Sequence, residues 1–204
     1  MTEINKNAKS SMRIKADEIK KHICKNLIVV IENPRNFKNI GTIVRNVNAL
    51  GAEKVYIIDT VGILPKDWQD MRSQKGLLKT SVSAIKWSFV RVFEDTQSCI
   101  NHLEKKNFIS AVTSPHIKGQ NNIVLHEGDY THKKLAVWFG TESHGISDLA
   151  VENSKLCINI PMFGMIESLN LGTSTGIVLY EITKQRREFQ NTHKRSIRNK
   201  ITDI

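Results

Sequence analysis

The side chains best suited to chemistry stand in short polar segments that directly follow apolar runs. The first such segment, residues 33–45 (NPRNFKNIGTIVR), follows the apolar run 27–31. Asn39 and Gly41 mark a turn entering a helix, and Arg45 comes one helical turn after Gly41. An arginine in this position can bind phosphate through its forked N–H donors. The alternative is an ordinary solvated arginine on a helix surface.

The second segment, residues 140–145 (GTESHG), follows the apolar run 135–139. A phosphate-binding loop needs Lys and then Ser or Thr after its second glycine, but here Ile146 and Ser147 follow Gly145. The dinucleotide pattern G-x-G-x-x-G is missing as well, which disfavours an NTPase and a nicotinamide dehydrogenase. Glu142 would repel phosphate between these glycines, and is better suited to accept hydrogen bonds from hydroxyl or ammonium groups.

The third segment, residues 160–170 (IPMFGMIESLN), precedes the last predicted helix. Pro161 ends the preceding strand, and Gly164 permits an irregular backbone. Ser168 and Asn170 then stand at the start of the helix. Capping of that helix is the more common role for these two residue types, and the other is a polar contribution to a binding site.

A scaffold of alternating strands and helices is expected to position these segments. A helix is predicted at 66–78 and a long surface loop at 115–130, because that stretch is polar and holds two glycines. The alternation predicts an α/β fold with a mostly parallel sheet flanked by helices. In such sheets ligands bind beyond the carboxyl ends of the strands, where all three segments would meet. The predicted strands are 27–31, 54–59, 85–89, 108–113, 135–140 and 156–160, and the other predicted helices are 40–50, 95–105 and 170–189.

Positive charge is concentrated at the two ends of the chain. The formal net charge is +10, and residues 1–26 and 184–204 hold 14 of the 30 basic residues but only 5 of the 20 acidic ones. Met12, Ala16, Ile19 and Ile23 recur at helical spacing between lysines, which predicts an amphipathic N-terminal helix with a basic face. A nearly neutral body with basic ends suggests a polyanionic partner, although two solvated tails would look the same.

Composition excludes several other classes of protein. No apolar run reaches the roughly 20 residues of a membrane span, and residues 1–10 are polar, so no membrane partner and a cytoplasmic location are expected. The three cysteines, Cys24, Cys99 and Cys157, form no C-x-x-C pair, and the seven histidines lack ligand spacing. We therefore expect no metal site and no disulfide framework.

Taken together and in this order, the three segments resemble the SpoU (TrmH-like) family of RNA ribose 2′-O-methyltransferases, in the SPOUT class. The resemblance covers residues 27–189, so residues 1–26 are expected to be a basic helical extension and 190–204 a basic tail. The residues 172–175 (GTST) depart from the family pattern, which affects helix packing more than chemistry. Within the family, the last helix is most similar to that of the tRNA guanosine-2′-O-methyltransferase branch. The matching positions are Asn39, Gly41 and Arg45; Gly140, Glu142 and Gly145; and Ile160, Pro161, Met162, Ser168, Leu169 and Asn170.

The resemblance implies a fold, a cofactor and an assembly. It implies a deep trefoil knot in the C-terminal half of the sheet and S-adenosylmethionine bound in that knot. Backbone groups at Gly140, Ile160, Leu169 and Thr113 would hold the cofactor. It also implies a homodimer in which Arg45 and Asn39 reach toward the partner's site.

The roles of the site residues follow from their chemistry. A guanidinium is a poor general base, so Arg45 is expected to bind a neighbouring phosphate and to stabilise the developing alkoxide; family proposals that involve it in deprotonation stay open. Asn39, Ser168 and Asn170 would orient ribose, cofactor or arginine, and Glu142 would fix an arginine or the substrate.

Alternatives to this interpretation remain within and outside the family. Because the chain has short basic arms in place of a separate RNA-binding domain, tRNA is favoured over 23S rRNA as the substrate. A non-catalytic RNA-binding protein of the same fold need not keep Asn39, Arg45, Glu142, Ser168 and Asn170 together, and a nucleotide-binding α/β enzyme lacks its phosphate motifs.

Overall fold

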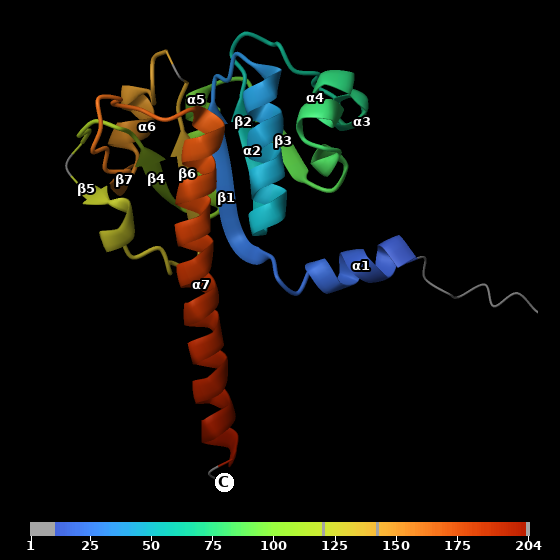
Figure 1. Ribbon diagram of the computed structural model, residues 1–204, viewed down its shortest axis with the longest axis vertical. Coiled ribbons are helices and arrows are strands. Elements are labelled where there is room, and N and C mark those ends of the chain that lie inside the picture. Colours follow the sequence, from blue (N-terminus) through green and yellow to red (C-terminus); the bar gives the residue numbers. More distant parts are fainter. Residues whose placement is uncertain (1–10, 120, 142, 203–204) are drawn as a thin grey trace, which may run out of the picture.

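A seven-stranded parallel sheet forms the centre of the computed structural model, which describes residues 11–119, 121–141 and 143–202 (Figure 1). The strand order is β3-β2-β1-β6-β4-β7-β5, and all six strand pairs are parallel. The prediction of an α/β fold with a parallel sheet is therefore confirmed. The strands are β1 (Cys24–Glu32), β2 (Ala52–Ile58), β3 (Phe89–Phe93), β4 (Ile109–Thr113), β5 (Asn122–Val124), β6 (Leu135–Phe139) and β7 (Leu156–Asn159).

Helices cover both faces of the sheet, which is why the central strands are apolar along their length. Side chains of α2, α4 and α7 share a buried cluster with one face, and side chains of α5 and α6 share a second cluster with the other. The helices are α1 (Ser11–Ile19), α2 (Phe37–Leu50), α3 (Trp68–Ser73), α4 (Lys75–Thr80), α5 (Thr96–Lys105), α6 (Asp148–Glu152) and α7 (Leu171–Thr202), with short 3-10 helices at Ala84–Lys86 and Leu125–Glu127.

Two glycines let α2 approach its neighbours closely. A Cβ atom on Gly41 would lie 1.9 Å from the hydroxyl oxygen of Thr80 in α4. A Cβ atom on Gly172 of α7 would lie 2.6 Å from the methyl group of Thr42 in α2. Gly41 of the first motif therefore has a packing role, and the departure at Gly172 affects the contact between α2 and α7, as expected.

α2 ends at Leu50 as predicted but begins at Phe37, three residues before the predicted start at residue 40. The Asn36 side chain accepts a hydrogen bond from the backbone N–H of Lys38 and caps the first turn. Gly51 adopts the left-handed conformation, with φ of 75°, and its N–H donates to the Val47 carbonyl, so this glycine caps the carboxyl end of the helix. Ile40, Ile43, Val44 and Val47 form the buried side of the helix, so the partly exposed Asn39 and the exposed Arg45 lie away from it.

The structure corrects two local predictions. Residues 85–89 were expected to form a strand, but Ile85 lies in a 3-10 helix and the strand begins at Phe89. The reason is a tight turn, in which Val82 and Ser83 both have positive φ. Residues 115–130 were expected to be a loop, but they contain β5, whose three residues are stabilised by pairing with β7. A strand this short has little local signal, because pairing rather than propensity forms it.

One internal helix and the two terminal helices differ from their predicted bounds. The predicted helix at 66–78 is divided into α3 and α4 by Gln74, and α7 continues beyond residue 189 to Thr202. α1 ends at Ile19, and the Ile14 and Ile19 side chains are about half exposed. The side chain of Met12 lies outside the part that the structure describes. α1 and the end of α7 leave the body on the side where the strands begin (Figure 1).

Candidate active site

A pocket of about 520 Å³ lies at the carboxyl ends of β4, β6 and β7. This is the edge of the sheet at which ligands of parallel α/β proteins bind. The second and third motif segments and the end of β4 contribute its walls. The lining residues are Thr113, Ser114, Pro115, His116, Lys118, Phe139, Gly140, Thr141, Ser143, His144, Gly145, Ile158, Ile160, Met162, Ser168, Leu169, Asn170, Leu171 and Ser174.

The segment 140–145 folds back on itself at one wall of the pocket. Thr141 and Gly145 exchange two backbone hydrogen bonds of 3.0 and 2.9 Å, and Gly145 has a φ of 67°. A Cβ atom on Gly140 would lie 2.1 Å from the carbonyl carbon of Gly145. Only glycine permits this close return of the chain. The tip carries two polar side chains in contact, with 2.7 Å between Ser143 Oγ and His144 Nδ1.

A buried carboxylate holds the far end of this segment. Glu32, the last residue of β1, is only 3% exposed. Its oxygens accept hydrogen bonds from the backbone N–H and the hydroxyl of Ser147, at 2.8 and 2.7 Å, and from the hydroxyl of Thr96 at 2.6 Å. Ser147 in turn caps α6. Glu32 therefore fixes the segment to the central strand, a role that sequence reasoning missed because the residue looked like a strand end.

The segment before α7 forms the opposite wall. The Asn170 side chain accepts a hydrogen bond of 2.9 Å from the N–H of Gly172, which is the capping role considered from the sequence. Its amide nitrogen lies 3.4 Å from the side-chain oxygen of Asn39 and donates to it. Ser168 is exposed and lines the pocket together with the partly exposed Leu169.

The end of β4 completes the floor. The hydroxyl of Thr113 donates to the carbonyl of Trp138 in the neighbouring strand, at 2.8 Å. The side-chain amide of Asn159 donates to the carbonyls of Ser114 and Pro115, which fixes the turn after β4. Backbone groups at Thr113 and Ser114 therefore have fixed positions at the pocket.

The structure brings together six of the nine residues predicted for the site, which line the pocket: Thr113, Gly140, Ile160, Ser168, Leu169 and Asn170. Asn39 is joined to them through its hydrogen bond with Asn170. Arg45 is exposed on α2 and is not among the residues that line the pocket of a single chain. Glu142 lies outside the described residues.

Sequence reasoning missed several polar side chains of the pocket. His116 and Lys118 stand in the stretch that was predicted to be a loop, and His144 stands within the second motif. The Lys118 ammonium donates to the Ile146 carbonyl at 3.1 Å and lies 3.7 Å from the Asp148 carboxylate. The position of both histidines directly after apolar strands was the available signal.

Other kinds of site find no support in the described residues. None of their His, Cys, Asp and Glu side chains gather in a group that could hold a metal ion, and none of their helices is long and apolar enough to span a membrane. The three cysteines are buried and not in disulfides. Burial raises the pKa of each thiol, that of Cys99 to about 12, so these thiols are poor nucleophiles at neutral pH.

Comparison with known proteins places this chain among RNA-modifying enzymes. It is 28% identical to the tRNA (guanosine(18)-2′-O)-methyltransferase of Thermus thermophilus, over 85% of this chain and 82% of that protein. It is 30% identical to the enzyme of the same name from Aquifex aeolicus, over 80% and 72%. It is also 30% identical to the 23S rRNA (adenosine(1067)-2′-O)-methyltransferase of Streptomyces azureus, over 76% and 53%.

A solved structure and a family model agree with these relatives. The crystal structure of the A. aeolicus TrmH/SpoU tRNA modifying enzyme superimposes with a TM-score of 0.71 at 27% identity, covering 88% of this chain and 86% of that one. The model of the SpoU rRNA Methylase family matches residues 26–180, which is more than half of the chain. The chain therefore belongs to the SpoU rRNA Methylase family.

Proposed function

We propose that this protein transfers a methyl group from S-adenosylmethionine to a ribose 2′-hydroxyl of RNA, and that the RNA is a tRNA methylated at a guanosine. The observation that carries the proposal is the convergence of the second and third family motifs on one pocket at the carboxyl edge of the sheet. The first motif meets them through the hydrogen bond between Asn170 and Asn39.

The pocket suits S-adenosylmethionine in size and in chemistry. Its volume of about 520 Å³ is within the range of small-molecule sites. Ile160 and Leu169 offer apolar surface for a flat base, and backbone groups fixed at Thr113 and Gly140 can bind its polar edge. When bound, the cofactor supplies an electrophilic methyl group on a sulfonium.

The protein's own residues then have to bind and orient the ribose. Arg45 holds a phosphate next to the reacting hydroxyl and stabilises negative charge on its oxygen. Ser168 offers a hydroxyl at the pocket wall, and Asn39 and Asn170 fix the geometry between α2 and α7. Accurate placement is the main requirement, because methyl transfer needs the hydroxyl oxygen in line with the methyl group.

We further propose that the active unit is a homodimer, with Arg45 of one protomer serving the pocket of the other. Phe163, Met165 and Ile166 are exposed by 95%, 97% and 69% beside the pocket, and Tyr180 of α7 by 62%. A monomer rarely exposes such a cluster of large apolar side chains. A second copy would cover them, and would supply the arginine that a single chain keeps outside its own pocket.

The trefoil knot and the domain boundaries belong to this proposal as well. Residues that follow β4, β6 and β7 line the same pocket, which is compatible with a knotted C-terminal half. The methyltransferase domain is residues 27–189, preceded by a basic extension and followed by a basic tail. tRNA is preferred over rRNA as the substrate because the two relatives named for tRNA align with this chain over 82% and 72% of their length, whereas the relative named for 23S rRNA aligns over 53%. A cytoplasmic location fits such a substrate.

Calorimetry with S-adenosylmethionine tests the function. Saturable binding that S-adenosylhomocysteine displaces is expected, and Leu169→Asp, which puts a charge on the pocket wall, should abolish it. Val61→Asp makes the same kind of change at a side chain that is 74% exposed and lies outside both the pocket lining and the exposed cluster, so it serves as the control that keeps cofactor binding. Absence of binding at millimolar cofactor would exclude the proposed enzyme.

Mixing two inactive variants tests the shared site. Arg45→Ala keeps its pocket, and Leu169→Asp keeps its arginine. If Arg45 acts on the partner's pocket, heterodimers hold one complete site and activity returns on mixing. Mixtures that form heterodimers yet stay inactive would place the arginine and the pocket of one site on the same chain.

A further inference from the structure

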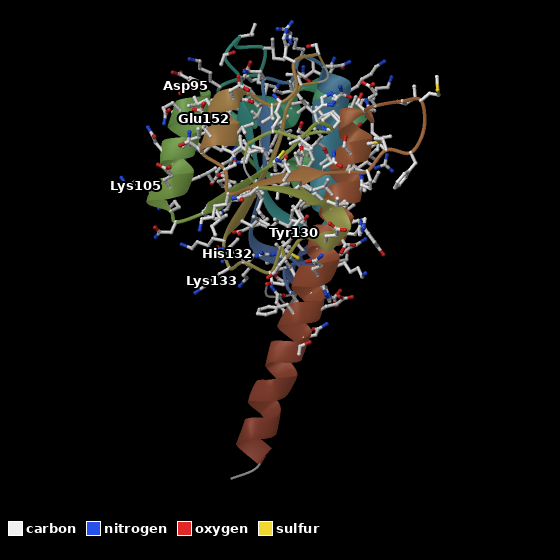
Figure 2. The ribbon with its side chains drawn as sticks, turned by 90° about the vertical axis from the view of Figure 1, so that its left-hand side faces the viewer. Asp95, Lys105, Tyr130, His132, Lys133 and Glu152 are labelled. Carbon is white, nitrogen blue, oxygen red and sulfur yellow. The ribbon has the colours of Figure 1, made fainter. Side chains whose placement is uncertain are left out.

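Lysines gather at the edge of the sheet where the strands begin, opposite the pocket. Lys25 and Lys54 lie near the starts of β1 and β2, and Lys106 and Lys134 lie just before β4 and β6. Because all strand pairs are parallel, these starts form a single edge. In Figure 2, Lys105, His132 and Lys133 lie toward this edge, whereas Asp95 and Glu152 lie toward the other. We call this set the amino-edge surface: Lys25, Lys54, Arg91, Lys105, Lys106, Lys133 and Lys134.

Hydrogen bonds show that the amino-edge surface is contiguous and held in place. The guanidinium of Arg186 in α7, which is 4% exposed, donates to the carbonyls of Lys25 at 3.1 Å and Lys133 at 3.4 Å. It also donates to the carbonyls of Tyr130 and His132. The Lys134 ammonium donates to the Lys106 carbonyl at 2.7 Å. Backbones that carry these lysines are therefore fastened together, and the side chains of Lys25, Lys106 and Lys133 are exposed.

Carboxylates do not neutralise this surface. Lys54 lies 3.2 Å from Glu53, but that is the one ion pair found for its members among residues 11–119, 121–141 and 143–202. The pKa of His102 is lowered, first by burial and then by the positive charges of Arg91, Lys106, Lys54 and Lys105. After burial, the four cations are the causes of the lowered pKa, so they lie close enough to His102 to act on its protonation together.

Aromatic rings lie beside the cations. Trp87 is 58% exposed and Phe89 54% exposed, at the start of the edge strand β3. The Lys54 ammonium lies 5.6 Å from the centre of the Phe89 ring, and Arg91 lies 4.8 Å from that of Phe93. Exposed rings next to cations can stack on unpaired bases, while the cations bind phosphates.

We propose that the amino-edge surface is a second RNA-binding site, which holds phosphates of the substrate far from the methylated ribose. The inference rests on the proposed function. Strands of five to nine residues, at about 3.3 Å per residue, separate this edge from the pocket by roughly 15–30 Å. A folded RNA can span that distance, whereas a hairpin whose stem has only a few base pairs reaches less far from the pocket. α1 and the end of α7, which belong to the basic ends of the chain, leave the body at this edge as well (Figure 1).

The triple variant Lys105→Glu, Lys106→Glu and Lys133→Glu tests the proposal. Its matched control carries the same change of charge on the other side of the molecule, at the exposed Lys66, Lys75 and Lys79. Loss of three phosphate contacts should lower the slope of log affinity against log salt by roughly 2–3 and weaken tRNA binding at least about tenfold. The control should lose little, and both variants should keep wild-type cofactor affinity and melting temperature.

A second RNA separates remote contacts from those at the pocket. A hairpin of the substrate that contains only the methylated loop should bind wild type and the triple variant equally. The inference is overturned if the triple variant binds tRNA like wild type, if the control loses as much, or if hairpin binding falls equally. The proposed function fails separately, if wild type binds no cofactor or methylates no RNA.

The double variant Trp87→Ala with Phe89→Ala tests the stacking of bases on the exposed rings. It should reduce the affinity for tRNA without changing the slope of log affinity against log salt, and an altered slope would argue against stacking.

Discussion

Two buried charges of opposite sign lie at the two ends of β1, that of Glu32 in β1 itself and that of Arg186 in α7, and they hold different kinds of surface. At the carboxyl end, the Glu32 carboxylate accepts hydrogen bonds from Ser147 and Thr96. At the amino end, the Arg186 guanidinium donates to four carbonyls, among them that of Lys25. The first organises a pocket of small and polar residues, and the second organises a row of lysines. Burying a charge is costly unless hydrogen bonds compensate it, so both edges are fixed structures.

This difference separates two tasks. Close approach of backbone segments, as at Gly140 and Gly145, forms a cavity that suits a small cofactor. Exposed lysines without carboxylate partners suit a long polyanion, whose charges are spread over many positions. Variants at one edge should therefore change cofactor binding, and variants at the other should change RNA binding or stability.

The largest effect is expected from Arg45→Ala, which tests the chemistry of the carboxyl edge. Methylation should fall by about a thousandfold or more, because loss of a group that stabilises developing charge costs roughly this much. Cofactor affinity and fold should not change, since the side chain lies outside the pocket lining. Single-turnover assays with saturating RNA measure the loss. Near-normal turnover would remove Arg45 from the site.

Gly140→Ala should have the next largest effect on the reaction, through cofactor binding at the same edge. Its Cβ atom would lie 2.1 Å from the carbonyl carbon of Gly145, so the segment has to move. Cofactor affinity should fall by at least about tenfold, which corresponds to 1.4 kcal/mol. The matched control is Gly164→Ala, whose Cβ atom would meet nothing within 4 Å. Calorimetry compares the two, and equal affinities would show that the close return of the chain does not shape the pocket.

A pair of alanine variants separates the edges most directly. Arg186→Ala leaves four carbonyls without their donor and should destabilise by roughly 3 kcal/mol, or about 6–12 °C in melting temperature. Glu32→Ala should destabilise similarly. Of the two, only Glu32→Ala is expected to weaken cofactor binding in the folded protein. Lys184→Ala, on the exposed side of α7, is the control for Arg186. Equal losses of cofactor affinity would mean that the edges are not independent.

The smallest effect concerns His102 and the charge of the amino edge. Its pKa is lowered by burial and by four neighbouring cations. As pH falls below about 6.5, the unfolded chain binds a proton that the folded chain resists, so this group's contribution to stability is present above that pH and is lost below it. NMR titration should show the lowered pKa in wild type and a higher one in the variant Lys105→Glu with Lys106→Glu. An unchanged pKa would contradict the proposed positive potential.

The sequence predicted which segments meet at the carboxyl edge better than it predicted the outer strands of the sheet. Motif segments after strands carry strong local signals, such as the glycines of 140–145 and the proline that ends β7, and these segments do meet at one pocket. β5 and the start of β3 depend on pairing and on a turn at Val82 and Ser83, which residue types alone do not reveal. The buried roles of Glu32 and Arg186 depend on partners 115 and 161 residues away, such as Ser147 and Lys25.

Methyl transfer to RNA is the central claim, and one assay measures it directly. Purified protein is incubated with isotopically labelled S-adenosylmethionine and with tRNA or rRNA that was isolated from cells lacking the protein. Nucleosides are then analysed by mass spectrometry. The account predicts label in a 2′-O-methylated nucleoside of tRNA, with wild type and not with Arg45→Ala. Label on a base, or none in any RNA under conditions in which the protein binds the cofactor, would contradict it.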